Sequence, residues 1–174
     1  MISTLRAELG ALLDTWSLPR PSAGPVVGLS LHYAGFGLDL SGRYLVPRDV
    51  DAPLPAGVQA RIDLLAGALG AGFSLHHDRF SWGPRAELEL GYLHGRSSGT
   101  IGGDDTGAFW ASAWGGLTLA VRLHERVTVG AASLLGVPLR RPRFALQGEP
   151  AFYTTGPVGL RFFLALSVAL TTTD

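Results

Sequence analysis

The sequence contains no cysteine, lysine or asparagine, and only 16% of its residues are charged. Without cysteine it has neither a disulfide framework nor a thiolate metal site. Acidic and basic residues balance at 14 each, with no long basic tract, which argues against nucleic-acid binding. No segment approaches the ~18 to 20 consecutive apolar residues of a membrane-spanning helix. Since 47% of the residues are nevertheless hydrophobic, two classes remain: a soluble all-β fold or a membrane β-barrel.

No linker divides the 174 residues, so we expect a single domain over residues 1–174. The 24 glycines are scattered through segments of alternating polarity, which argues against long helices. The start, Met1-Ile2-Ser3, leads directly into this alternation without a signal peptide. Because an exported barrel requires a signal peptide, we expect the sequence to be a mature or excised segment.

The alternation predicts eight strands, over residues 4–17, 26–33, 36–46, 58–75, 80–95, 109–123, 127–137 and 152–170. Short turns follow the second, fourth and sixth strands, and longer connections cover residues 18–25, 47–57, 96–108 and 138–151. Outer-membrane barrels alternate in this way, with their short turns facing the periplasm. A strand of ~10 residues, rising ~3.3 Å per residue and tilted by ~40°, spans an apolar band of ~25 Å. The pattern therefore predicts an all-β, eight-stranded antiparallel up-and-down transmembrane β-barrel with both termini periplasmic.

Two positions disturb the alternation. In the segment 58–75, Leu65 and Leu69 fall on the polar face, and a bulge after Gly67 would restore the pattern. Pro84 lacks the N–H group that an inner strand of a closed barrel uses, which predicts a bulge near the neighbouring short turn.

Charged side chains gather on one face of the predicted strands, and the opposite face carries none. A face free of charge across eight strands indicates contact with hydrocarbon. The lumen of an eight-stranded barrel is just wide enough to be filled by side chains. Because an unpaired charge in such a lumen costs free energy, we expect the charged side chains to form ion pairs that plug the lumen. We expect the pairs Arg6–Glu8 and Arg61–Asp63, with Arg85 between Glu87 and Glu89. The expected lumen network comprises Arg6, Glu8, Asp39, Arg43, Arg61, Asp63, Arg85, Glu87, Glu89, Arg122 and Arg161, and Asp14 lies on the same face.

Aromatic residues lie near the ends of the predicted strands. Amphipathic rings at both membrane interfaces would form two girdles, although aromatic residues are also simply good strand formers. The expected girdle residues are Trp16, Tyr33, Phe36, Tyr44, Phe80, Trp82, Tyr92, Phe109 and Phe152.

In strand count, loop alternation and girdles the whole chain resembles the small eight-stranded outer-membrane barrels, such as the OmpA transmembrane domain and OmpX. Its last strand, GLRFFLALSVAL over 159–170, is similar to the C-terminal assembly signal of that class, although Thr171-Thr172-Thr173-Asp174 follows it in place of a terminal aromatic residue. The resemblance implies the outer membrane of a Gram-negative bacterium, insertion by the barrel assembly machinery, contact with outer-membrane lipid and lipopolysaccharide, and a monomer. It transfers no binding residue and implies no cofactor.

Some outer-membrane barrels are lipid-A-modifying enzymes, which need a nucleophile and a base. The only such grouping is His94 with Ser97 or Ser98 and with Asp104 or Asp105. Because this spacing is common by chance, we predict no enzymatic activity. His76-His77-Asp78 could be proposed as a metal site, but adjacent strand residues point apart, so we interpret it as part of a turn.

The sequence favours a structural role, either as a membrane anchor for a periplasmic domain or as a recognition surface built from the long loops. In one of these loops, Leu139-Arg140-Arg141-Pro142-Arg143 could contact lipopolysaccharide phosphates, or could be an ordinary solvated loop. Two alternatives remain open. One is a narrow pore for small solutes; the other is a soluble lipocalin-like barrel whose apolar face lines a ligand site.

Overall fold

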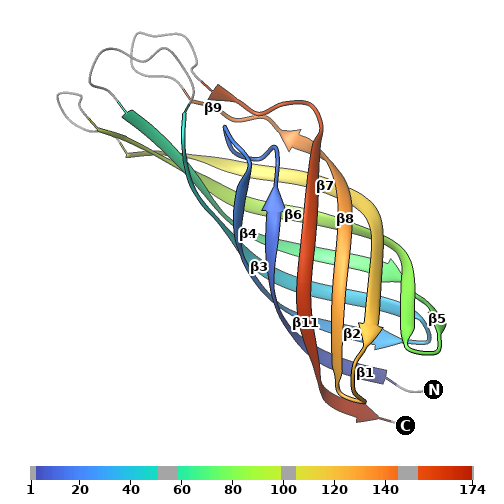
Figure 1. Ribbon diagram of the computed structural model, residues 1–174. Coiled ribbons are helices and arrows are strands. Elements are labelled where there is room, and N and C mark those ends of the chain that lie inside the picture. Colours follow the sequence, from blue (N-terminus) through green and yellow to red (C-terminus); the bar gives the residue numbers. More distant parts are fainter. Residues whose placement is uncertain (1–2, 51–58, 99–104, 145–152, 174) are drawn as a thin grey trace.

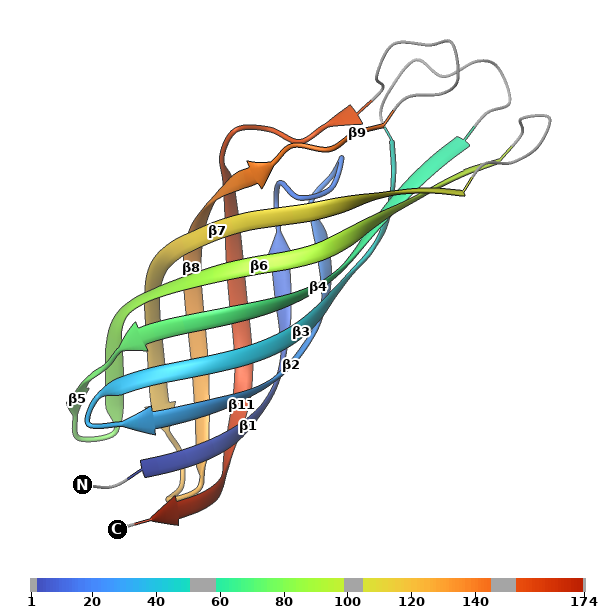
Figure 2. The same ribbon diagram turned by 180° about the vertical axis from the view of Figure 1, so that it is seen from behind.

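The computed structural model describes residues 3–50, 59–98, 105–144 and 153–173. Within these residues, eight long strands form a closed antiparallel barrel, as predicted (Figures 1 and 2). They are β1 (Ser3–Asp14), β2 (Ser22–Tyr33), β3 (Phe36–Asp49), β4 (Gln59–Phe73), β6 (Phe80–Ser98), β7 (Asp105–Arg122), β8 (Val127–Arg140) and β11 (Gly159–Thr173). The short strand β5 (Leu75–His77) continues the β4–β6 hairpin, and β9 (Arg143–Phe144) pairs with β10 (Tyr153–Thr154) outside the barrel wall.

Successive long strands pair around the barrel, and the ring closes because β1 pairs with both β2 and β11. Closure removes the free strand edges at which open sheets aggregate. In the described part of the chain, no helix is long and apolar enough to cross a membrane.

One end of the barrel, the short-turn end, carries the tight connections β2–β3, β5–β6 and β7–β8 together with both chain termini (Figure 1). The β2–β3 hairpin turns on Ala34 and Gly35, both with positive φ (49° and 87°). Two such residues form a type I′ turn, whose twist matches that of paired strands. The opposite end, the loop end, carries the longer connections. The predicted alternation of short and long connections is therefore confirmed.

Several strand boundaries differ from the predicted ones, mainly at the loop end. β2, β3, β6, β7 and β8 all extend into segments expected to be loops, because residues there stay paired to a neighbouring strand. Gly24, Gly107 and Pro138 are among these paired residues. In contrast, β1 stops at Asp14 and β11 begins only at Gly159. The expected first strand was too long, and the expected last strand began too early.

The predicted bulge after Gly67 was wrong. β4 pairs with β3 in one register from Leu64 to Phe73, so that Leu65 and Leu69 face outward and the even-numbered residues face the lumen. The register of β3 shifts instead between Leu45 and Arg48, around Pro47, where a missing N–H is tolerated.

Pro84 causes an interruption rather than the expected bulge. Pairing with β6 stops at Gly72↔Arg85 and resumes at Leu75↔Trp82 in the same register. The gap that separates β4 from β5 therefore lies opposite Gly83 and Pro84. The N–H of Ser74, in this gap, donates to the carbonyl oxygen of Gly35 at 2.7 Å.

The outer face carries a continuous apolar band of exposed Leu, Val, Phe, Tyr and Trp side chains. Along β6 it runs from Trp82 to Tyr92, ten residues apart. At ~3.3 Å per residue and a tilt of ~40° this is ~25 Å, the height of the apolar band of outer-membrane barrels.

Most expected girdle residues lie at the borders of this band. Tyr33, Phe36, Phe80 and Trp82 are exposed at the short-turn end. At the loop end, Tyr44 lies opposite Leu65, Leu65 lies opposite Tyr92, and Tyr92 lies opposite Phe109. The three aromatic residues therefore lie in one row across neighbouring strands. Phe152 lies outside the described residues. Trp16 was wrongly assigned, because its ring lies inside the barrel and is only 7% exposed.

Candidate functional site: the lumen

A chain of ion pairs crosses the lumen between β3, β6, β11 and β1. It alternates four carboxylates with three guanidinium groups and runs Asp39, Arg85, Glu87, Arg43, Glu89, Arg161, Asp14. The N–O distances along this ion chain are 2.5, 2.7, 3.0, 3.2, 2.6 and 2.6 Å in that order. Residues two or four apart on one strand face the same side, so β3 and β6 can each place several charged side chains of the ion chain in the lumen.

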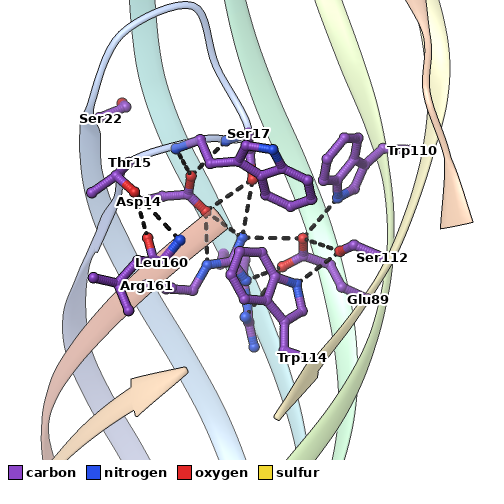
Figure 3. Close-up of polar contacts among 12 residues, drawn as sticks. Asp14, Thr15, Ser17, Ser22, Glu89, Trp110, Ser112, Trp114, Leu160 and Arg161 are labelled. Atoms are coloured by element: carbon purple, nitrogen blue, oxygen red, sulfur yellow. Dashed lines mark hydrogen bonds and ion pairs between the residues drawn. The ribbon is translucent and has the colours of Figure 1, made fainter. Parts of the chain in front are cut away.

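Arg161 is the most enclosed cation of the chain, with a fully buried side chain (Figure 3). Its Nε and Nη2 donate to Asp14 Oδ2 at 2.8 and 2.6 Å, and its Nη1 donates to Glu89 Oε2 at 2.6 Å. The guanidinium carbon also lies 3.7 Å from the centroid of the Trp114 ring. Arg161 Nη2 also donates to Glu89 Oε1 at 3.2 Å, so that Glu89 is bound through both of its oxygens. Such bidentate, fully desolvated contacts are the strong form of the Arg–carboxylate interaction.

The two carboxylates that bind Arg161 are held by further donors (Figure 3). Asp14 accepts the backbone N–H groups of Trp16 (2.9 Å) and Ser17 (2.6 Å) and the Ser17 hydroxyl (2.9 Å). Glu89 accepts Trp110 Nε1 (2.7 Å) and the Ser112 hydroxyl (3.1 Å), and Ser112 in turn accepts Trp114 Nε1 (2.8 Å). Since a buried carboxylate is stable only when paired and hydrogen-bonded, these donors fix both anions in place.

Three tryptophan rings pack beside this end of the ion chain and form a tryptophan layer. Trp16 meets Trp110 and Trp114 edge to face, each at a centroid distance of 5.4 Å. Gly159 and Gly136 leave room for the rings, because a Cβ at either position would overlap the Trp16 or Trp114 indole. Buried Leu45, Ile62, Leu64, Leu93 and Leu134 belong to the same apolar cluster and form an apolar layer with the tryptophan rings. This apolar layer was not expected from the sequence.

A hydrogen bond joins two of the connecting segments at the loop end. Tyr153, on β10, donates its hydroxyl to the carbonyl oxygen of Ser17 at 3.0 Å, and so ties the β8–β11 connection to the segment after β1. Burial raises the pKa of the Tyr153 phenol to about 12.

The short-turn half of the lumen is not filled. It contains a chamber of about 410 Å³, lined among others by Arg6, Glu8, His32, Asp39 and Thr128. The expectation that side chains fill the whole lumen therefore fails in the short-turn half. The small side chains that line the chamber, such as Gly10, Gly37 and Ala165, leave this space open.

The expected pair Arg6–Glu8 does not form as a direct contact. Arg6 Nη1 donates instead to Thr128 Oγ1 at 2.7 Å, and Glu8 accepts the Ser30 hydroxyl at 2.7 Å. Arg122 lies exposed at the rim and donates to the carbonyl oxygen of Asp78 at 3.0 Å. The ion chain contains six of the expected lumen residues, namely Asp39, Arg43, Arg85, Glu87, Glu89 and Arg161.

Arg61 and Asp63 were wrongly assigned to the lumen, because both lie on the outward side of β4, where Arg61 is exposed and Asp63 is only 9% exposed. Arg61 pairs with Asp49 at 2.7 Å, with side chains 63% and 58% exposed. Asp63 lies beside His94, with an Nδ1–Oδ1 distance of 3.9 Å.

Of the grouping considered for catalysis, the described residues His94, Ser97 and Ser98 do not come together. His94 and Ser97 are three residues apart on β6, and this odd spacing puts them on opposite faces of the strand. Ser98 shares the face of His94 but lies four residues along the strand, ~13 Å away. Asp104 lies outside the described residues, and the backbone of Asp105 pairs with Arg96. The described residues contain no cluster of three or more His, Asp or Glu that could hold a metal ion.

Comparison with known proteins finds relatives in three-dimensional structure only. No protein-family model and no curated protein sequence matches the chain. A major outer membrane protein from Thermus thermophilus superposes with a TM-score of 0.72 at 8% identity, over 97% of this chain and 99% of that one. The chain has the fold of the small outer-membrane β-barrels.

Two further barrels show the same likeness. Neisserial surface protein A matches with a TM-score of 0.59 at 9% identity, covering 95% of this chain and 96% of its own. Ail, the attachment invasion locus protein of Yersinia pestis, solved with the heparin analogue sucrose octasulfate, matches with a TM-score of 0.56 at 11% identity, covering 99% and 98%. At these identities the shared property is the fold.

Proposed function

We propose that the chain is a closed outer-membrane barrel that acts as a membrane anchor and presents a recognition surface at its loop end, without conducting solutes. The observation that supports the proposal is the dense packing of buried side chains in the loop half of the lumen. There the ion chain, the tryptophan layer and the apolar layer leave the Glu89 and Arg161 side chains with no exposed surface. An open pore would need a continuous polar path through this region.

The outer membrane is the proposed location, with the short turns and both termini in the periplasm. The outward apolar band supports this, because its ~25 Å height matches that of outer-membrane barrels. The soluble lipocalin-like alternative fits less well, because the charges face inward and the bulky apolar side chains face outward. We further propose that the barrel is a monomer and that the barrel assembly machinery inserts it, with β11 as the assembly signal.

Lipopolysaccharide is the proposed partner of the loop end. Arg140, Arg141 and Arg143 are exposed there. Arg61 of β4 and Arg96 of β6 are opposite each other in the strand register, four residues closer to the loop end than Leu65 and Tyr92. Arginine recognises phosphate and sulfate oxygens through its planar fork. The Ail barrel, of the same fold, was solved with a polysulfated ligand, which makes a polyanion a reasonable ligand class for this end.

Conductance across a planar lipid bilayer tests the closed state. The refolded wild-type barrel, whose insertion is verified by a band shift on boiling in a denaturing gel, should show no discrete openings. The double variant Trp114→Ala/Arg161→Ala should conduct, because it removes both a ring and a cation of the seal. Arg61→Ala/Leu88→Ala is the matched control and should remain silent. Openings in the wild type would instead establish the narrow pore.

Binding to lipopolysaccharide tests the recognition surface. The triple variant Arg140→Gln/Arg141→Gln/Arg143→Gln should bind less tightly than the wild type, and the weakening should shrink at high salt. Arg79→Gln/Arg126→Gln, in turns at the opposite end, is the matched control. Equal binding by all three proteins would contradict a role for the loop-end arginines.

A further inference from the structure

The chamber in the short-turn half of the lumen has the dimensions of a binding site for a small molecule. Its volume of about 410 Å³ falls in the range of ligand pockets, roughly 300–1,000 Å³. It is separate from the sealed loop half, and residues next to the tight turns, including His32, Ala34 and His76, line its open end. A solute in it would enter and leave from the short-turn side.

Most charged groups of the chamber already have partners. Arg85 binds Asp39 and Glu87, and Arg43 binds Glu87 and Glu89. The carboxylate of Glu8 accepts the hydroxyl of Ser30 at 2.7 Å, and this hydroxyl lies 3.3 Å from His32 Nε2.

Arg6 differs from the other arginines of the chamber wall. It makes no ion pair within 4.0 Å that the described residues record, and its Nη1 donates only to the neutral Thr128 hydroxyl. Its Nε is buried and has no hydrogen-bond partner among the described residues. A buried guanidinium donor without an acceptor costs free energy, which an incoming anion would recover.

Further donors converge beside Arg6. Thr128 of β8 is directly opposite Ser167 of β11 and Arg122 of β7 in the strand register. Because the Thr128 oxygen accepts from Arg6, its own proton is free to be donated to a ligand. This part of the chamber wall therefore offers the Arg6 guanidinium and two hydroxyl groups, whereas Arg122 lies exposed at the rim.

We propose that the chamber binds a small solute carrying an oxyanion, such as a carboxylate or a phosphate, on Arg6 and Thr128. The guanidinium fork suits both groups, since each presents two oxygens in the same plane. Glu8, two residues along β1, limits the size of the anionic group and disfavours a polyanion. This site lies beyond the anchoring and recognition role and does not depend on whether the barrel conducts.

Calorimetric titration of the detergent-refolded barrel with inorganic phosphate, and separately with acetate, tests the site. Chloride holds the ionic strength constant, so that general screening does not change. We expect saturable binding of at least one anion at one site. Arg6→Gln should weaken it by about tenfold or more, since a charge-assisted hydrogen bond is lost. Arg126→Gln, in the exposed β7–β8 turn, should bind as the wild type does.

Thr128→Val keeps the shape of the side chain and provides a second test should Arg6→Gln not fold. It should weaken binding severalfold while the boiling-dependent gel shift is retained. The absence of saturable binding by either anion, or equal affinity in wild type, Arg6→Gln and Thr128→Val, would overturn the proposal. Conductance by the wild type, or a failure to bind lipopolysaccharide, would contradict the proposed function without affecting this proposal.

Discussion

Replacing Arg161 by Gln should destabilise the barrel far more than any exposed arginine would. The ion chain carries three guanidinium groups and four carboxylates, so its net charge of −1 would become −2. Asp14 would lose the cation that it pairs with, and Glu89 would keep Arg43. Removing one partner of a buried pair costs about 3–5 kcal/mol, mostly because the other charge is left uncompensated.

The matched control is Arg61→Gln, which breaks an ion pair of similar length whose side chains are more than half exposed. Such a pair contributes about 0–1 kcal/mol. Equilibrium unfolding in urea, with the barrel in lipid vesicles, should be followed by tryptophan fluorescence and by the gel shift. Adding Asp14→Asn to Arg161→Gln should restore part of the loss, because the stranded carboxylate is neutralised. If Arg161→Gln costs no more than Arg61→Gln, the ion chain does not stabilise the barrel.

Two further predictions concern other parts of the molecule. Leu88→Arg, near the middle of the outward apolar band, should lower the free energy of unfolding in vesicles by about 2–4 kcal/mol, and Leu139→Arg at the loop end by about 0–1 kcal/mol. Equal losses would contradict the proposal that the apolar band lies in the hydrocarbon of the membrane. The raised pKa of Tyr153, about 12 against an ordinary value of ~10, means that its stabilising contribution is complete below pH ~10 and is lost as pH rises through about 12. The tyrosinate absorbance difference between wild type and Tyr153→Phe should titrate near 12; titration near 10 would show that the phenol is not buried.

The outward apolar face and the barrel itself could be predicted from the sequence, because a period of two survives in most strands. The pairing partners could not. Arg6 and Glu8 look like natural partners at a spacing of two, yet the lumen offers Thr128 and Ser30 from other strands. Which strands meet across a barrel depends on tilt and stagger, and one sequence does not reveal these quantities.

The errors at Arg61 and Trp16 have local causes. In β4 both faces carry leucine, so the alternation could not decide which parity faces the lumen, and the charges of Arg61 and Asp63 suggested the wrong one. Charges on the outward face become acceptable at the loop end, beyond the apolar band. Trp16 lies two residues after the end of β1, and the chain turns there because Asp14 accepts the backbone N–H groups of Trp16 and Ser17. This turn has no signature in the alternation.

The position of the Asp14–Arg161 pair also bears on how the barrel is assembled. The two residues lie directly opposite each other on β1 and β11, 147 residues apart in sequence. They can meet only when these two strands pair, and a contact of such long range forms late and slowly. Before that step Arg161 can keep Glu89, but Asp14 would face a partly dry interior without a cation, a state that costs several kcal/mol. The Asp14–Arg161 pair thus penalises a barrel in which β1 and β11 are not yet paired, and we expect it to make the closure of the ring cooperative.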